Sequence, residues 1–257
     1  MAKVSLIVPV YNADDWFPEC LASIRAQTYK DVELIVIDDP EGTGAGNARN
    51  RGIEKATGDY IAFCDADDYL EPDAIERMVH VASGVEMVIG SFRKFGDFEQ
   101  RVSHHTETMN RRKVAKYCLG NLRSPRSNQM LSGCWAKLYR RELVGRFPAL
   151  TTAEDMAFNY DYLKRCENVR FLNSTVYHNR KRKGSLSTTF NENDKPGLFG
   201  FLLALRYVRT FLEEFYEDEE IENAIDNSKV YHTMLYYMRI CQQTGKPMRD
   251  VLMELYP

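Results

Sequence analysis

Three continuous runs of β-branched and other apolar residues occur in the first 64 positions, and each is followed by a stretch of helical character. These runs are Lys3–Val10, Val32–Asp38 and Tyr60–Cys64. An unbroken apolar run of this kind is typical of a strand that is buried on both faces, as in a parallel sheet. A fourth run, Val85–Phe92, follows another helical segment. The alternation predicts an open α/β sheet that is mixed, mostly parallel and flanked by helices.

The middle of the chain has a weaker pattern. The segment Gly96–Leu131 is polar and basic, and its apolar residues show little periodicity, so we expect only helix and loop there. Further strands are expected at Trp135–Tyr139 and Val169–Tyr177, on either side of a helix that begins near Glu154. Asn47 is expected to cap the helix that precedes the third strand.

From Gly197 onward the pattern is all-helical, so we expect residues 1–190 to form the sheet domain and residues 191–257 a helical extension. Apolar residues recur at helical spacing and form a stripe on each of two helices. They are Leu198, Phe201, Leu205, Val208, Leu212 and Phe215 on the first helix, and Val230, Met234, Met238 and Cys241 on the second. Such a stripe normally packs on the body of the protein or on a second copy, and a membrane surface is the alternative.

Charge is segregated along the chain. The formal net charge is −3, but residues 1–100 carry a net −10, residues 101–190 carry +12 and residues 191–257 carry −5. This distribution disfavours a uniformly basic nucleic-acid-binding protein. The six cysteines show neither a C-x-x-C pair nor zinc spacing, and the N-terminus shows no signal-peptide pattern. We therefore expect free thiols and a cytoplasmic location.

Acidic residues cluster where three of the predicted elements begin or end. Asp38 and Asp39 close the second run, Asp65–Asp68 follows the third, and Glu154 and Asp155 open the later helix. Ligands of open α/β sheets bind beyond the carboxyl ends of the strands. Two carboxylates one residue apart can also face one Mg²⁺ or Mn²⁺ ion. Helix capping or a turn remains the alternative for any single pair.

Two other interpretations fail. An EF-hand that starts at Asp65 would need a glycine where Leu70 stands. The glycine-rich segment Gly42–Gly46 follows the second strand rather than the first, which argues against a dinucleotide-binding loop. The basic run Arg180–Ser185 is compatible either with a solvated surface or with a loop that meets a diphosphate, with His178 beside it.

In this order the motifs resemble bacterial family 2 glycosyltransferases of the GT-A fold, of the polysaccharide-biosynthesis type. The resemblance covers residues 3–190 and is carried by VSLIVPVYN, VELIVIDD, ARNRGIEKATGDYIAFCDADDYLEPD, CWAKLYRREL, AED and RKRKGS. It implies a metal-dependent, inverting transfer of a hexosyl or N-acetylhexosaminyl group from a nucleotide-diphosphate sugar, with a UDP-sugar favoured. The acceptor would be a hydroxyl of a saccharide or lipid-linked saccharide. The alternative is a catalytically inactive binding protein of the same fold.

The resemblance also implies roles for particular residues. Those expected to bind the nucleotide sugar are Pro9, Tyr11, Asp39, Arg49, Asp65, Arg180 and Arg182. The Mn²⁺ or Mg²⁺ that bridges the donor diphosphate would be bound by Asp67, Asp65 and His178. Asp155 would be the general base.

One segment departs from the family pattern. Pro40–Gly46 is shorter than the corresponding segment of family members, so we expect one edge strand to be missing, together with part of the wall that binds the base. The basic residues of 101–190 are expected to face the acceptor and to allow peripheral contact with the inner face of a membrane. The C-terminal helices are a candidate surface for a homo-oligomer.

Overall fold

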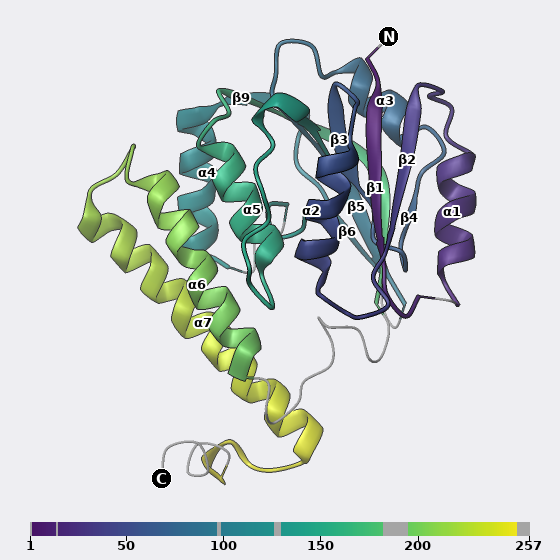
Figure 1. The fold of residues 1–257 in the computed structure, drawn as a ribbon. Coiled ribbons are helices and arrows are strands. Elements are labelled where there is room, and N and C mark those ends of the chain that lie inside the picture. Colours follow the sequence, from purple (N-terminus) through teal and green to yellow (C-terminus); the bar gives the residue numbers. More distant parts are fainter. Residues whose placement is uncertain (1, 14, 97–98, 126–129, 182–194, 251–257) are drawn as a thin grey trace.

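Figure 1 shows a computed structural model that describes residues 2–13, 15–96, 99–125, 130–181 and 195–250. The strands are β1 (Val4–Val10), β2 (Val32–Asp38), β3 (Tyr60–Phe63), β4 (Tyr69–Leu70), β5 (Met87–Phe95), β6 (Gln100–Val102), β7 (Glu107–Asn110), β8 (Lys137–Arg140) and β9 (Asn168–Arg180). The helices are α1 (Phe17–Arg25), α2 (Ala45–Lys55), α3 (Ala74–His80), α4 (Arg111–Arg123), α5 (Glu154–Leu163), α6 (Lys195–Leu212) and α7 (Asp218–Thr244), with a 3-10 turn at Arg141–Leu143.

The sheet is open and mixed. Its main path runs β2–β1–β3–β8–β5–β9–β4, with β6 paired to β5 and β7 paired to β9. Strands β1, β2 and β3 pair in parallel, as do β5 and β9, whereas β8 runs antiparallel to both β3 and β5. The carboxyl ends of β1, β2, β3, β5 and β9 therefore share one edge. Because β8 is reversed, the loop that precedes it lies at the same edge.

The predicted α/β class is confirmed, and so are the strands that it rested on. Five consecutive residues of β1, Val4–Val8, are buried, as a continuous apolar run requires. Within the described residues, β2 pairs only with β1, and the chain passes from β2 through a short turn directly into α2. The segment Pro40–Gly46 adds no strand, so β2 forms the edge of the sheet.

The segment from Gly96 to Leu131 contains more than the helix and loop that the sequence predicts. Strands β6 and β7 lie there, antiparallel to β5 and β9. Strand β6 pairs with Phe92–Lys94, beyond the part of β5 that β8 covers. Both added strands are short and largely exposed, so their sequences show no apolar alternation. They form because two longer strands offer free backbone groups beside them.

Helix α2 begins earlier than predicted. The sequence places the cap at Asn47, but the helix starts at Ala45 and the capping position is Gly44, with φ of 105°. Glycine adopts this backbone conformation without the steric cost that a Cβ would impose. Asn47 lies inside the helix and donates to the carbonyl of Thr43 at 2.8 Å.

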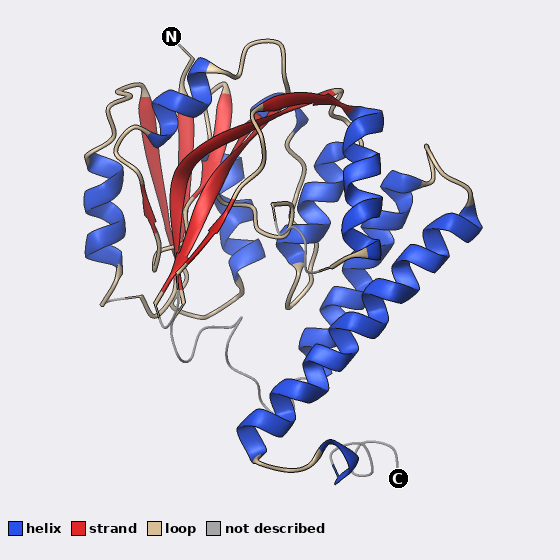
Figure 2. Cartoon of the chain, turned by 180° about the vertical axis from the view of Figure 1, so that it is seen from behind, coloured by secondary structure: helices blue, strands red, loops and turns tan. Residues whose placement is uncertain are grey.

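Helices α6 and α7 form a hairpin that packs on α4 and α5 and extends beyond the sheet (Figures 1 and 2). The main core continues into this hairpin through Leu205, Val208, Phe211, Leu212, Ile221, Ala224 and Ile225. The domain boundary predicted at residue 190 lies outside the described residues. No helix in the described part of the chain is long and apolar enough to cross a membrane.

The centre of the α6 stripe packs on the body of the protein as predicted, whereas the α7 stripe does not pack on the described part of the body. Contact of the α7 stripe with a second copy or a membrane surface stays a prediction. Val230 and Met234 of the predicted stripe are 60% and 58% exposed. Helix α7 instead buries Ile221, Ala224, Ile225, Tyr236, Tyr237 and Ile240. The helix carries apolar residues on two faces, and contact with α4 and α6 decides which face is buried.

Candidate functional site

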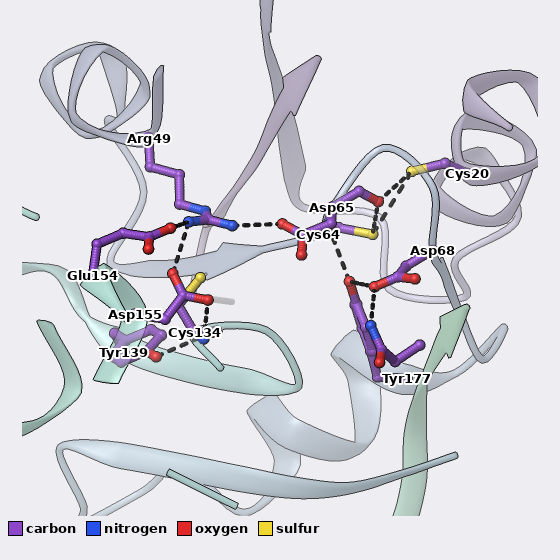
Figure 3. A network of polar contacts seen from close by, with 11 residues as sticks. Cys20, Arg49, Cys64, Asp65, Asp68, Cys134, Tyr139, Glu154, Asp155 and Tyr177 are labelled. Carbon is purple, nitrogen blue, oxygen red and sulfur yellow. Dashed lines mark hydrogen bonds and ion pairs between the residues drawn. The ribbon is translucent and has the colours of Figure 1, made fainter. Parts of the chain in front are cut away.

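Arg49 lies at the centre of a buried cluster of ion pairs (Figure 3). Its side chain is 4% exposed, and its Nη2 atom lies 2.7 Å from Oδ1 of Asp65. Its Nη1 atom lies 2.7 Å from Oδ1 of Asp155 and 3.1 Å from Oε1 of Glu154. One guanidinium group on α2 thus joins Asp65, the second residue after β3, to the first two residues of α5.

The loop before β8 holds the other oxygen of Asp155. The backbone N–H of Cys134 donates to Asp155 Oδ2 at 3.3 Å. This loop is fixed by the buried Lys137, whose Nζ donates to the carbonyl oxygens of Gly133 at 2.5 Å and Trp135 at 3.3 Å. Both Asp155 oxygens therefore have a donor, which fixes the direction of the carboxylate.

A second buried carboxylate, Asp68, anchors the turn after β3 to the end of β9. Asp68 accepts hydrogen bonds from the Tyr177 hydroxyl at 2.7 Å, from Asn179 Nδ2 at 2.9 Å and from the Arg180 backbone N–H at 2.7 Å. The Tyr177 hydroxyl also accepts from the backbone N–H of Asp65 at 3.0 Å. These contacts hold the acidic turn at the carboxyl edge of the sheet.

The cluster carries more negative than positive charge, and its pKa values reflect this. Burial, followed by repulsion from Asp155, raises the pKa of Glu154 to about 7. Burial also raises the pKa of Asp155, although Arg49 opposes the change. For Asp68, burial and two neighbouring aspartates raise the pKa well above the usual range. A site of this kind favours binding of a cation.

Glu154 gives the ligand-free chain a stability that depends on pH. Folding raises the pKa of Glu154 from 4.5 to about 7. The stability that comes from protonation of Glu154 is therefore fully present below pH 4.5 and is lost as the pH rises through about 7. Glu154→Gln, which stays neutral, should therefore raise the free energy of unfolding by up to roughly 3 kcal/mol at alkaline pH and change it little at acidic pH. Denaturant unfolding at both pH values measures this.

The matched control for that experiment is Glu142→Gln, because the Glu142 side chain is 70% exposed. We expect no comparable pH-dependent gain from it. An equal effect of Glu154→Gln at acidic and alkaline pH would contradict the proposed titration.

The ends of β1 and β2 bring together the residues predicted to bind the nucleotide. Pro9, in β1, is in register with Ile37 of β2. Tyr11 is 54% exposed, and its ring lies over the backbone of Gly42 so closely that a Cβ there would come within 2.9 Å of the ring. Gly42 also has φ of 64°. The turn after β2 thus supports an exposed aromatic ring at the carboxyl edge.

Asp39 is held from several sides. It is 3% exposed and accepts hydrogen bonds from Thr43 Oγ1 at 2.6 Å, from Arg51 Nη2 at 2.7 Å and from the Gly44 backbone N–H at 3.2 Å. Burial alone would raise its pKa, but these donors outweigh burial and the pKa is lowered. Asp39 is therefore a fixed, ionised acceptor beside the turn that carries Tyr11.

Arg180, at the end of β9, is also built into the structure. Its guanidinium carbon lies 4.2 Å from the centroid of the Trp16 ring and 4.6 Å from that of Phe95. Its Nε donates to the carbonyl oxygen of Asp67 at 3.0 Å, and it forms an ion pair with Glu19. The predicted phosphate-binding arginine and the predicted metal-binding aspartate are thus neighbours. The other predicted arginine, Arg182, lies outside the described residues.

His178, a predicted metal ligand, contacts Glu71 and Tyr69. Its Nε2 lies 2.7 Å from Oε1 of Glu71, and its ring stacks on Tyr69 with centroids 4.3 Å apart. Among the described residues, no three His, Cys, Asp or Glu side chains form a group that could hold a metal ion. Asp65 and Asp67 remain as the candidate pair.

Several features of the cluster were not predicted from the sequence. The resemblance implies a place for Arg49 beside the nucleotide, whereas the structure shows it between three carboxylates. Glu154 was predicted only as part of an acidic pair, and the contributions of Cys134 and Lys137 were missed. Lys137 within the predicted strand Trp135–Tyr139 is the one visible signal, because a charge in a buried strand needs built-in partners.

The sequence is similar to those of known glycosyltransferases. The sequence model described as glycosyl transferase family 2 matches residues 5–43 and 39–147. Glycosyltransferase GlyA of Streptococcus pneumoniae serotype 4 is 28% identical over 225 residues, which cover 74% of this chain and 32% of GlyA. The chain thus spans about a third of the length of that relative. The uncharacterized glycosyltransferase YibD of Escherichia coli is 25% identical, over 95% of this chain and 80% of YibD.

Solved structures show the same fold. S. aureus TarS in complex with UDP-GlcNAc matches with a TM-score of 0.69 and 18% identity, over 96% of this chain and 77% of that chain. The mannosyltransferase PcManGT from Pyrobaculum calidifontis, in complex with GDP-Man and Mn²⁺, matches with a TM-score of 0.53 and 16% identity, over 97% and 82% of the two chains. TarS and PcManGT share with this chain a curled, open α/β sheet.

Proposed function

The chain belongs to glycosyltransferase family 2, and we propose that it transfers a sugar from a nucleotide-diphosphate sugar to an acceptor hydroxyl, with inversion at the anomeric carbon. The observation that carries this proposal is the single guanidinium of Arg49 between Asp65 and Asp155. In the proposed reaction Asp65 acts on the donor side and Asp155 acts as the base, and both pair with this one guanidinium. The complexes of TarS with UDP-GlcNAc and of PcManGT with GDP-Man support a nucleotide-sugar donor.

The donor side of the proposed site consists of residues at the ends of β1, β2 and β9. The exposed ring of Tyr11 and the ionised Asp39 are suited to contact the base and ribose. Arg180 is held between two aromatic rings next to Asp67, which suits its guanidinium to contact the diphosphate in exchange for its ion pair with Glu19.

The acceptor side is centred on Asp155. Burial raises the pKa of this carboxylate, which makes it a stronger base than an exposed aspartate, while Arg49 keeps it oriented. In the proposed reaction Asp155 accepts the proton of the acceptor hydroxyl as that oxygen attacks the anomeric carbon from the face opposite the diphosphate. No covalent intermediate on the protein is required.

The residues also fit a divalent cation. Asp65 and Asp67 offer hard oxygen ligands one residue apart, in a region where burial, together with the charges of Asp65 and Asp67, raises the pKa of the neighbouring Asp68. Mg²⁺ and similar ions are commonly held by only one or two carboxylates together with substrate phosphates. When bound, Mn²⁺ or Mg²⁺ supplies Lewis-acid neutralisation of the charge on the leaving diphosphate.

Calorimetry with Mn²⁺ and UDP, followed by an assay of UDP-sugar hydrolysis and transfer, tests this proposal. We expect nucleotide binding that depends on the metal, and release of UDP in the presence of the donor. A chain that binds nucleotide but neither hydrolyses nor transfers any donor of a UDP- and GDP-sugar panel would be a binding protein of this fold.

Asp67→Asn is expected to abolish the dependence on metal and most of the turnover, because an amide is a much weaker ligand for Mn²⁺ than a carboxylate. Metal titration of the transfer rate measures the effect. Asp73→Asn is the matched control, since Asp73 pairs only with Arg77 on the surface among the described residues. Wild-type transfer by Asp67→Asn would show that the metal assignment is wrong.

A further inference from the structure

The two ends of the hairpin formed by α6 and α7 carry opposite charge. Residues 213–226, around the connection between the helices, carry eight acidic side chains and no basic one. Residues 227–250, which form the rest of α7 and the turn after it, carry four basic side chains and one acidic one, Asp250. The switch occurs within a single helix, so it separates the two ends of the hairpin in space.

The acidic end is used to attach the hairpin to the body. Glu214 pairs with Arg111 at 2.6 Å and Glu220 pairs with Arg123 at 2.8 Å, both across to α4. Arg209 of α6 also pairs with acidic residues of this end. These contacts account for the acidic charge without any external partner.

The basic end exposes apolar side chains, and Lys229 at its start pairs with Asp226 of α7 at 2.9 Å. Val230, Met234, Met238 and Met248 are 60%, 58%, 45% and 36% exposed. Met248 joins the surface because the chain turns after α7 and brings its sulfur within 3.8 Å of Cys241 Sγ. On α6, Phe199 and Leu203 are exposed at the same end of the hairpin, since the neighbouring Leu198 packs against Tyr236, Tyr237 and Ile240.

The placement of this end relative to the sheet is also informative. In Figures 1 and 2 strand β1 runs from the N-terminus toward the edge that carries the candidate site, and the basic end of the hairpin projects on that same side. A flat surface that contacted the projecting end would therefore face the site rather than the opposite edge of the sheet.

We propose that the basic, apolar end of the hairpin docks on an anionic lipid surface. Exposed methionine, valine and phenylalanine side chains would enter the boundary between headgroups and acyl chains, and Lys and Arg side chains beside them would meet the lipid charge. A neutral apolar partner would explain the exposed side chains but not the excess of basic over acidic residues at this end, where Asp250 is the one acidic residue of 227–250. Docking of this kind does not depend on the proposed transfer activity.

Sedimentation of the full chain with vesicles tests the proposal. We expect binding to vesicles that contain phosphatidylglycerol, weaker binding as salt is added, and little binding to phosphatidylcholine alone. Arg239→Gln combined with Arg249→Gln, both on exposed side chains, should weaken binding about 30-fold, because each basic residue near the surface contributes about fivefold. Met234→Glu should weaken binding at least about fivefold for the same electrostatic reason and by loss of apolar contact.

The matched control is Asn223→Glu, which adds the same charge to an exposed position of α7 at its acidic end. It should bind vesicles like the unaltered chain, and circular dichroism should show equal helix content in all variants. Absence of binding to anionic vesicles would overturn the proposal. So would a dimer in solution that Met234→Glu dissociates, since the face would then be an interface between two copies.

Discussion

Asp155→Asn is expected to lower the rate of sugar transfer by at least about 100-fold while leaving donor binding intact. Asparagine has the size of aspartate, and its oxygen can still accept the 2.7 Å hydrogen bond from Arg49, while the longer contact with the Cys134 N–H is lost because an amide NH2 cannot accept it. Asparagine cannot take up the proton of the acceptor hydroxyl. The loss should therefore fall on the transfer step, and steady-state transfer together with calorimetric binding of the donor separates the two.

Asp161→Asn is the appropriate control, because Asp161 lies on the same helix and pairs with Lys164 and Arg165 at the surface. It should transfer at the rate of the unaltered chain. Transfer by Asp155→Asn at that rate would eliminate Asp155 as the base. A parallel loss of donor affinity would instead place Asp155 in the donor site.

A large part of this fold was predictable because its central strands are buried on both faces. In β1 and β3 nearly every residue is buried, so the sequence shows unbroken apolar runs that have no competing interpretation. Parallel pairing then places the carboxyl ends of these strands at one edge. The location of the acidic residues after β2 and β3 at that edge can therefore be predicted without any knowledge of side-chain contacts.

The contacts within the site were not predictable in the same way. Arg49 and Asp155 are 106 positions apart, and their pairing depends on how α5 docks beside α2. The position of Cys134 depends on the reversed direction of β8, which no local pattern indicates. For α7, periodicity reveals apolar residues on two faces, and only the packing of neighbouring helices distinguishes the buried face from the exposed one.

Arg49→Met is expected to lower the free energy of unfolding by about 3–5 kcal/mol at neutral pH, the usual cost when one partner of a buried ion pair is removed. Three carboxylates would then share a buried region with no guanidinium between them. Arg49→Lys should have an intermediate effect, because an ammonium keeps the charge but cannot reach three carboxylates as a planar fork does. Denaturant unfolding of each variant measures these differences.

Arg146→Met provides the control, since the Arg146 side chain is 70% exposed and pairs with Glu54 at the surface. We expect its free energy of unfolding to change by less than about 1 kcal/mol.

The pH dependence of the free energy of unfolding of Arg49→Met then distinguishes loss of the Arg49 charge from loss of its packing. Without Arg49, mutual repulsion raises the pKa of Glu154 and of Asp155 further, so the folded variant gains protons and part of its stability as pH falls. Loss of the contact between Arg49 and the Phe147 ring, 5.3 Å from its guanidinium carbon, would be independent of pH. If Arg49→Met lowers the free energy of unfolding equally at acidic and neutral pH, the role of Arg49 is packing and not electrostatic.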